Sequence, residues 1–168
     1  DTPNAVNLTW EEQPVSSSYP TRASGRDLGA TMPMWRVQTE GYRDEEGMLV
    51  GVVSPAELGD SPDGEFISGG LNTKGSDSVA IGRQGSYLHW GFAASPTYLT
   101  EEAKLVFVNA IHYIRQFDGE QAFVKNVSMM TRQDVDDMLY AITDEGFAAW
   151  TAMIGEIERE MQKQVDEI

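Results

Sequence analysis

The sequence predicts an α/β fold in which a small mixed sheet is packed by a buried helix, with an extended N-terminal arm and a long C-terminal amphipathic helix. Short apolar runs bounded by glycine and proline have the length of strands. Residues 100–117 and 143–167 carry helix caps and a helical spacing of apolar residues. We expect an arm over 1–33, an α/β core over 34–119 and a helical C-terminal extension over 120–168.

The first 33 residues are rich in proline, serine, threonine, asparagine and glycine, and their apolar residues follow no helical or strand period. This composition predicts an irregular or extended segment. Such an arm is either disordered or lies across a surface, which belongs to its own chain or to a partner. In the second case, we expect Trp10 and Tyr19 to anchor the arm to a protein partner.

The strands of the core are predicted from stretches that are apolar or β-branched and end near turn residues. The strand candidates are residues 34–37, 48–54, 65–68, 78–81 and 86–92. The last two are joined by a tight connection that ends at Gly85. The glycine-rich stretch from Gly69 to Asp77 is predicted to be a loop between strands.

Three threonines are predicted to cap the helices. Thr100 precedes two glutamates, which suit the positive end of a helix dipole, and its helix runs to about Phe117. The wide apolar face of this helix should lie against the sheet. Thr131, with Asp134 at the capping-box position, begins a second helix that ends near Ile142.

Thr143 is predicted to cap a third helix, which runs from about Asp144 to Glu167. Its apolar residues recur at alternating three- and four-residue steps, the spacing of a helix that packs along one stripe. We expect five of them to bind a partner: Phe147, Trp150, Ile154, Ile157 and Met161. Packing against the chain's own core is the alternative.

Composition excludes several classes of function. The net charge of −15 and the pI of about 4.3 argue against binding to nucleic acid or anionic lipid, since both require basic surface. The absence of cysteine excludes disulfides, thiolate catalysis and cysteine metal sites. The sequence contains no run of 18 apolar residues, so it predicts no membrane-spanning helix.

The chain begins at Asp1 rather than at methionine. We interpret this start as that of a mature protein whose signal peptide has been removed, which predicts a periplasmic or otherwise extracytoplasmic location. A trimmed fragment is the alternative.

Candidate catalytic and metal-binding residues are few. His89 and His112 have no acidic neighbour at the spacing of a metal pair. Asp60, Asp63 and Glu65 form an acidic loop that is interpreted as a solvated turn or, alternatively, a weak cation site. We therefore expect no cofactor, no metal and no enzymatic activity.

Residues 82–119 contain a Gly-Arg strand, a Gly-x-x-x-Pro type turn and a helix with an Asn-Ala-Ile motif followed by an aromatic residue. The residues that carry this pattern are Gly82, Arg83, Gly91, Pro96, Asn109, Ala110, Ile111 and Tyr113. The pattern resembles the C-terminal strand–turn–helix of glutamine-amidotransferase-like domains, in particular trehalose-utilisation-like (ThuA-like) proteins. The chain is too short for that family's full flavodoxin-like sheet and has no cysteine for a glutaminase nucleophile. The resemblance therefore implies a reduced α/β scaffold without the family's catalytic residues.

From these observations we expect a non-catalytic structural or accessory subunit of a larger extracytoplasmic or membrane-associated complex, for example a photosynthetic or respiratory one. Its partners would be other protein subunits. The alternative is a divergent carbohydrate-linked hydrolase, with a pocket near Arg83, His89 and Trp90, or a sugar-binding module that uses tryptophan and tyrosine faces.

Overall fold

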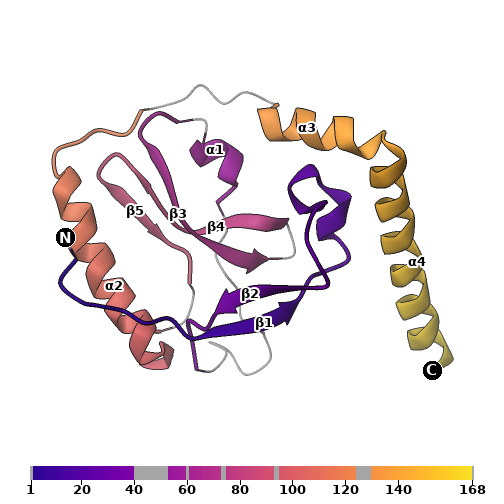
Figure 1. The fold of residues 1–168 in the computed structure, drawn as a ribbon, viewed down its shortest axis with the longest axis horizontal. Coiled ribbons are helices and arrows are strands. Elements are labelled where there is room, and N and C mark those ends of the chain that lie inside the picture. Colours follow the sequence, from indigo (N-terminus) through magenta and orange to yellow (C-terminus); the bar gives the residue numbers. More distant parts are fainter. Residues whose placement is uncertain are drawn as a thin grey trace. The chain divides into compact units, whose positions relative to one another are not determined.

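The computed structural model describes residues 2–39, 53–59, 61–72, 75–92, 95–123 and 130–167. The chain forms two compact units. Unit 1 contains residues 1–13 and 33–127, and unit 2 contains residues 14–32 and 128–168. The predicted α/β class is confirmed, because two small sheets occur together with helices, the last of which is long (Figure 1).

The larger sheet lies in unit 1 and has the order β3 (Gly64–Asn72), β4 (Gly75–Gln84), β5 (Tyr87–Trp90). Both strand pairs are antiparallel, so this sheet is not the mixed sheet that we expected. The prediction of a loop over residues 69–77 was wrong. Most of this stretch extends β3 and β4, which pair from Gly64↔Gln84 to Asn72↔Gly75 with register shifts that its glycines accommodate.

A tight turn joins β4 to β5, as predicted, and it requires glycine at position 85. Gly85 has a φ of 53°, in the left-handed region that glycine adopts without strain. A Cβ atom at this position would also lie 2.7 Å from the backbone nitrogen of Ala122. The turn therefore brings the β4–β5 hairpin close to the segment that follows the long helix of unit 1.

That helix is α2 (Glu101–Ile114), followed by a 3-10 turn over Arg115–Phe117. The predicted cap is confirmed, because Oγ1 of Thr100 accepts a hydrogen bond of 3.1 Å from the backbone N–H of Ala103. Figure 1 shows α2 running beside β5. One face of α2 packs on the sheet, while three of its apolar residues are exposed, so the helix is less buried than we expected: Leu105, Val108 and Ile111.

The core of unit 1 lies between α2 and the sheet. Its buried residues are Val37, Ala80, Ile81, Phe92, Leu99 and Ala103. Trp35 and Trp90 contact Phe92 edge to face, with ring centroids 5.6 and 5.1 Å apart. Of the strand predicted over Met48–Ser54, residues 48–52 lie outside the described residues, and Val53 forms a β-bridge with Val79. The short helix α1 (Pro55–Gly59) follows.

The N-terminal arm contains more regular structure than its composition predicts. Strand β1 (Trp10–Pro14) pairs with β2 (Thr31–Trp35) in the second sheet. The pairing is antiparallel, since it is flanked by backbone hydrogen bonds from Val15 to Ala30 and from Arg36 to Thr9. Residues 10–14 become a strand because they pair with residues 31–35, and the propensities of the residues themselves do not indicate this pairing.

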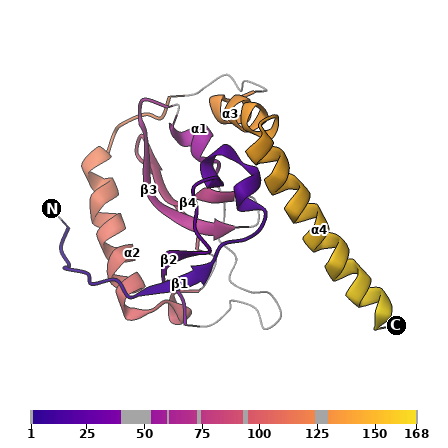
Figure 2. The same cartoon turned by 45° about the vertical axis from the view of Figure 1, so that its right-hand side comes forward.

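Unit 2 consists of two short 3-10 turns (Tyr19–Thr21 and Ala23–Gly25) and the helices α3 (Arg132–Ala141) and α4 (Asp144–Asp166). Figure 2 shows α4 leaving the end of α3 as one long rod. Both predicted caps are confirmed, because Thr131 and Asp134 form a capping box and Thr143 accepts from the backbone of Gly146. The 3-10 turns pack on these helices, and the backbone of Ala23 donates to Asp137 at 2.9 Å.

Candidate functional site

The apolar stripe of α4 is exposed. Its five predicted partner-binding residues have exposed fractions between 43% and 69%: Phe147, Trp150, Ile154, Ile157 and Met161. At about 100° per residue, these side chains fall within roughly 80° of the helix circumference. The apolar stripe of a helix normally faces a core. Here it faces solvent, and we call these five residues the α4 seam.

The C-terminal half of α4 has little support from unit 2. Every residue from Glu156 to Glu167 is exposed. Isolated helices shorter than about 12–15 residues are marginal in water, because most helix stability in proteins comes from packing an apolar face. The last three turns of α4 therefore carry the apolar residues of a packed helix without a packing surface in their own unit.

A second exposed stripe runs along α3 to its C-cap residue Ile142, and we call it the α3 stripe. Its members are between 41% and 82% exposed: Val135, Met138, Leu139 and Ile142. Sequence reasoning did not assign them to a site, although their spacing of three, one and three residues is that of one helix face. Ile142 and Phe147 lie on either side of the Thr143 cap, so the two stripes end at the same corner of the chain.

Charge surrounds the α4 seam. Between Asp144 and Asp166 there are six acids and two bases, a net of −4. Glu158 and Glu160 project on either side of the seam at the angles that 100° per residue assigns to them, and both are exposed. An apolar stripe with acidic flanks best matches an apolar groove with basic edges.

The two expected anchors of the N-terminal arm have different environments. Trp10 is exposed on β1. Tyr19 is 1% exposed and belongs to the core of unit 2, so its assignment as a partner anchor needs correction. The 3-10 turn that carries Tyr19 packs on α4, which removes this side chain from solvent.

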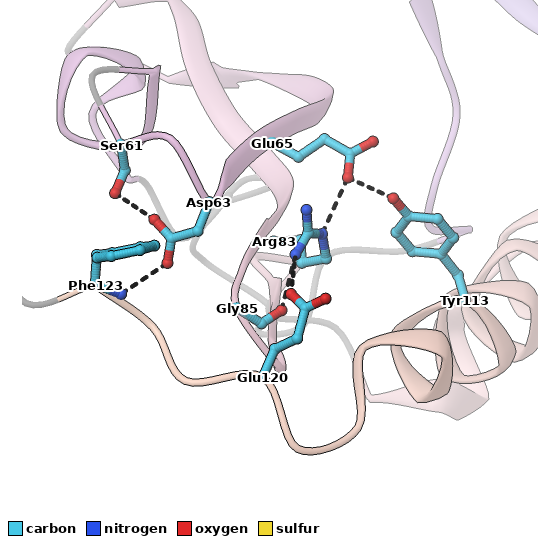
Figure 3. A network of polar contacts seen from close by, with 8 residues as sticks. All are labelled: Ser61, Asp63, Glu65, Arg83, Gly85, Tyr113, Glu120 and Phe123. Atoms are coloured by element: carbon cyan, nitrogen blue, oxygen red, sulfur yellow. Dashed lines mark hydrogen bonds and ion pairs between the residues drawn. The ribbon is translucent and has the colours of Figure 1, made fainter.

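Unit 1 contains a polar network centred on Arg83 (Figure 3). The guanidinium donates to Oε2 of Glu65 at 3.1 Å and to the carbonyl of Gly85 at 3.0 Å. The hydroxyl of Tyr113 donates to the same oxygen of Glu65. Arg83 also lies over the ring of Phe117, 3.7 Å from its centroid. The network ties β3 and β4 to α2.

Hydrogen bonding shifts the ionisation of this network. The hydroxyl of Tyr113, followed by Arg83, holds the pKa of Glu65 below its ordinary value. Burial, followed by the hydrogen bond to Glu65, raises the pKa of Tyr113. At neutral pH the pair is a carboxylate that accepts from a protonated phenol, so the network suits structural support better than proton transfer.

In the acidic loop predicted at residues 60–65, the carboxylate of Asp63 is also hydrogen-bonded within the chain. Asp63 accepts from Ser61 at 2.5 Å and from the backbone of Phe123 at 2.8 Å, and these bonds hold its pKa below the ordinary value. Asp60 lies outside the described residues. Within the described ranges, no group of three acidic or histidine side chains is arranged to hold a metal ion.

The two histidines lie on elements that also carry the network or adjoin it. His89 pairs in register with Gly82 of β4, and His112 precedes Tyr113 on α2. His89 is half-buried on β5, and His112 is exposed in the last turn of α2. A cavity of about 240 Å³ lies in unit 1, but its lining contains neither histidine, nor Arg83 or Trp90.

Comparisons with family models, curated proteins and solved structures find no match to this chain. The resemblance to amidotransferase-like domains stays a prediction from the sequence. In the part of the chain that the structure describes, no helix combines the length and the apolar character needed to cross a membrane.

The Glu65 network predicts a pH dependence of stability. A carboxylate with a depressed pKa stabilises the fold above its unfolded pKa, near 4.5, and this contribution is lost as the pH falls towards its folded pKa. Unfolding free energies measured by urea titration from pH 6 to pH 3 should therefore fall more steeply for the wild type than for Glu65→Gln. Tyr113→Phe removes the main cause of the shift and should give an intermediate slope. Tyr87→Phe changes an exposed tyrosine on β5 and should keep the wild-type slope, whereas equal slopes for all four proteins would contradict the assignment.

Proposed function

We propose that this chain is a non-catalytic accessory subunit that joins a larger protein assembly through the α4 seam and the α3 stripe. The supporting observation is the exposure of nine large apolar side chains on the two helices of one small unit. Exposed apolar surface of this extent is typical of protein interaction sites. A helix that presents residues at three- and four-residue steps is a common way to enter an apolar groove.

The occupant of this surface is a different protein, with an apolar groove and basic edges. Two copies of α4 would bring two helices of net charge −4 together, and like charges across an interface oppose association. Over its 23 residues, α4 is about 35 Å long, enough to supply the core of an interface of standard size together with α3. Trp150 is the best candidate for a central anchor, since tryptophan is enriched among residues that dominate binding.

The extracytoplasmic location and the photosynthetic or respiratory host stay predictions from the sequence. The hydrolase or sugar-binding alternative has less support. The cavity of unit 1 is not lined by Arg83, His89 or Trp90, the residues around which the hydrolase pocket is predicted.

Site-specific photo-crosslinking in the native source tests the proposal. A photoreactive phenylalanine analogue at Met161, on the seam, should form one adduct of fixed mass with a second protein. The same analogue at Ala152, on a different face of α4, is the matched control and should form little of this adduct. An adduct of twice the chain's own mass would identify self-association instead. Equal labelling from both positions would contradict a specific docking face.

A further inference from the structure

A cavity of about 240 Å³ lies beside the core of unit 1, where the C-terminal half of α2 faces the sheet. Its lining comes from alternate residues of strands, one face of α2 and the N-terminal segment: Thr2, Glu65, Ile67, Ile81, Leu88, Val106, Asn109, Ala110 and Tyr113. The cavity opens to solvent, since Ile67 is 42% exposed and Thr2 is exposed as well. This volume exceeds that of an apolar cavity of about 150 Å³ that binds benzene. The space is therefore sufficient for a small organic molecule.

Most of the lining is aliphatic, but one end carries the carboxylate of Glu65. Arg83 and Tyr113 both donate to Oε2 of Glu65, and among the described residues no hydrogen bond is directed to Oε1. Arg83 also lies 3.6 Å from Oε2 of Glu120, so one guanidinium faces two carboxylates and this end of the site does not attract an anion. The aliphatic lining disfavours any charged ligand, because a charge loses its hydration there. An ionised carboxylate oxygen accepts hydrogen bonds and donates none. Oε1 thus suits a neutral ligand with one O–H or N–H group.

The N-terminal segment completes one wall of the cavity. Asn109 on α2 binds both backbone groups of Asn4, accepting from its N–H at 3.0 Å and donating to its carbonyl at 2.9 Å. This exchange holds the chain next to Thr2 against α2, where Figure 1 shows the N-terminal segment passing. Since the amide of Asn109 is used in this way, Glu65 is the better-placed polar group for a ligand.

We propose that this cavity binds a small neutral molecule of the size of one substituted aromatic ring, with a single O–H or N–H group that donates to Oε1 of Glu65. The aliphatic wall supplies the affinity, and the carboxylate oxygen sets the orientation. This site is independent of the helices proposed to bind a partner.

Methyl NMR of the full chain tests the proposal with three probes of similar shape: phenol, toluene and benzoate. Phenol and toluene should shift the methyl signals of the lining residues Ile67, Ile81, Leu88 and Val106. The signals of Ile154 and Ile157 on α4 should stay in place. Phenol should bind roughly tenfold more tightly than toluene, because it adds one hydrogen bond to a charged acceptor. Benzoate should not bind.

Two kinds of variant separate the roles of wall and carboxylate. Ala110→Leu fills the cavity and should abolish the shifts with both neutral probes, and Val106→Phe offers a second filling variant if the first does not fold. Glu65→Gln should retain toluene binding and lose most of the preference for phenol. Unchanged binding in a folded filling variant, equal shifts on α4, or no shift with any probe would overturn the proposal.

Discussion

Replacing Trp150 and Ile157 with aspartate should lower the affinity for the partner by roughly 1,000-fold, because each side chain is expected to contribute about 2 kcal/mol as an interface anchor. Both side chains are 43–48% exposed, so their loss should leave unit 2 folded. Each aspartate would also place a charge in an apolar groove without a partner. Titration calorimetry with the purified partner, once photo-crosslinking has identified it, measures this loss of affinity.

Ala152→Asp is the matched control for this pair. It introduces the same charge on the same helix at an exposed position outside the seam, so affinity should stay within a few fold of wild type. Circular dichroism and thermal unfolding of all variants show whether the fold persists. Unfolding of unit 2 by the Trp150 and Ile157 changes would show that the seam is part of the chain's own core.

Gly146→Ala should destabilise unit 2 by about 3 kcal/mol, a loss typical of overpacking against backbone. A Cβ atom at this buried position would lie 2.1 Å from the carbonyl oxygen of Tyr140, so the α3–α4 corner would have to open. The ends of both exposed stripes lie at this corner, so the affinity for the partner should fall together with the stability of unit 2.

Gly155→Ala makes the same chemical change at a position with free space. The nearest atom to the new Cβ is Nη1 of Arg159, at 3.8 Å. Alanine in a helix interior is more favourable than glycine by about 1 kcal/mol, so this variant should stabilise α4. Fluorotryptophan NMR separates the units, because Trp150 reports on unit 2 and Trp90 on unit 1. A stable Gly146→Ala protein with an unshifted Trp150 signal would contradict the packing of this corner.

The helix caps were predictable because their signals are local. Thr100, Thr131 and Thr143 each accept a hydrogen bond from a residue three positions later, a relation that the sequence shows directly. The seam of α4 was predictable as a pattern for the same reason. Its exposure was not, since the same spacing serves a buried helix and a docking helix equally well.

Other features depend on contacts between distant parts of the chain. Tyr19 resembled a free anchor in an irregular segment, and it became a core residue because its 3-10 turn packs on α4. The sequence around Glu65 does not indicate its hydrogen-bond partners, since Arg83 and Tyr113 lie 18 and 48 residues away. The glycine-rich stretch at residues 69–77 joined the sheet because strand pairing outweighed its turn propensity.

Hydrogen exchange of the backbone amides in residues 156–166 tests the central claim most directly. In the free chain these amides should exchange rapidly, because the last turns of α4 have little packing in their own unit. In the native assembly the same amides should become strongly protected. Strong protection in the free chain, or exchange that is equally rapid in the assembly, would contradict the proposal that α4 is a docking helix.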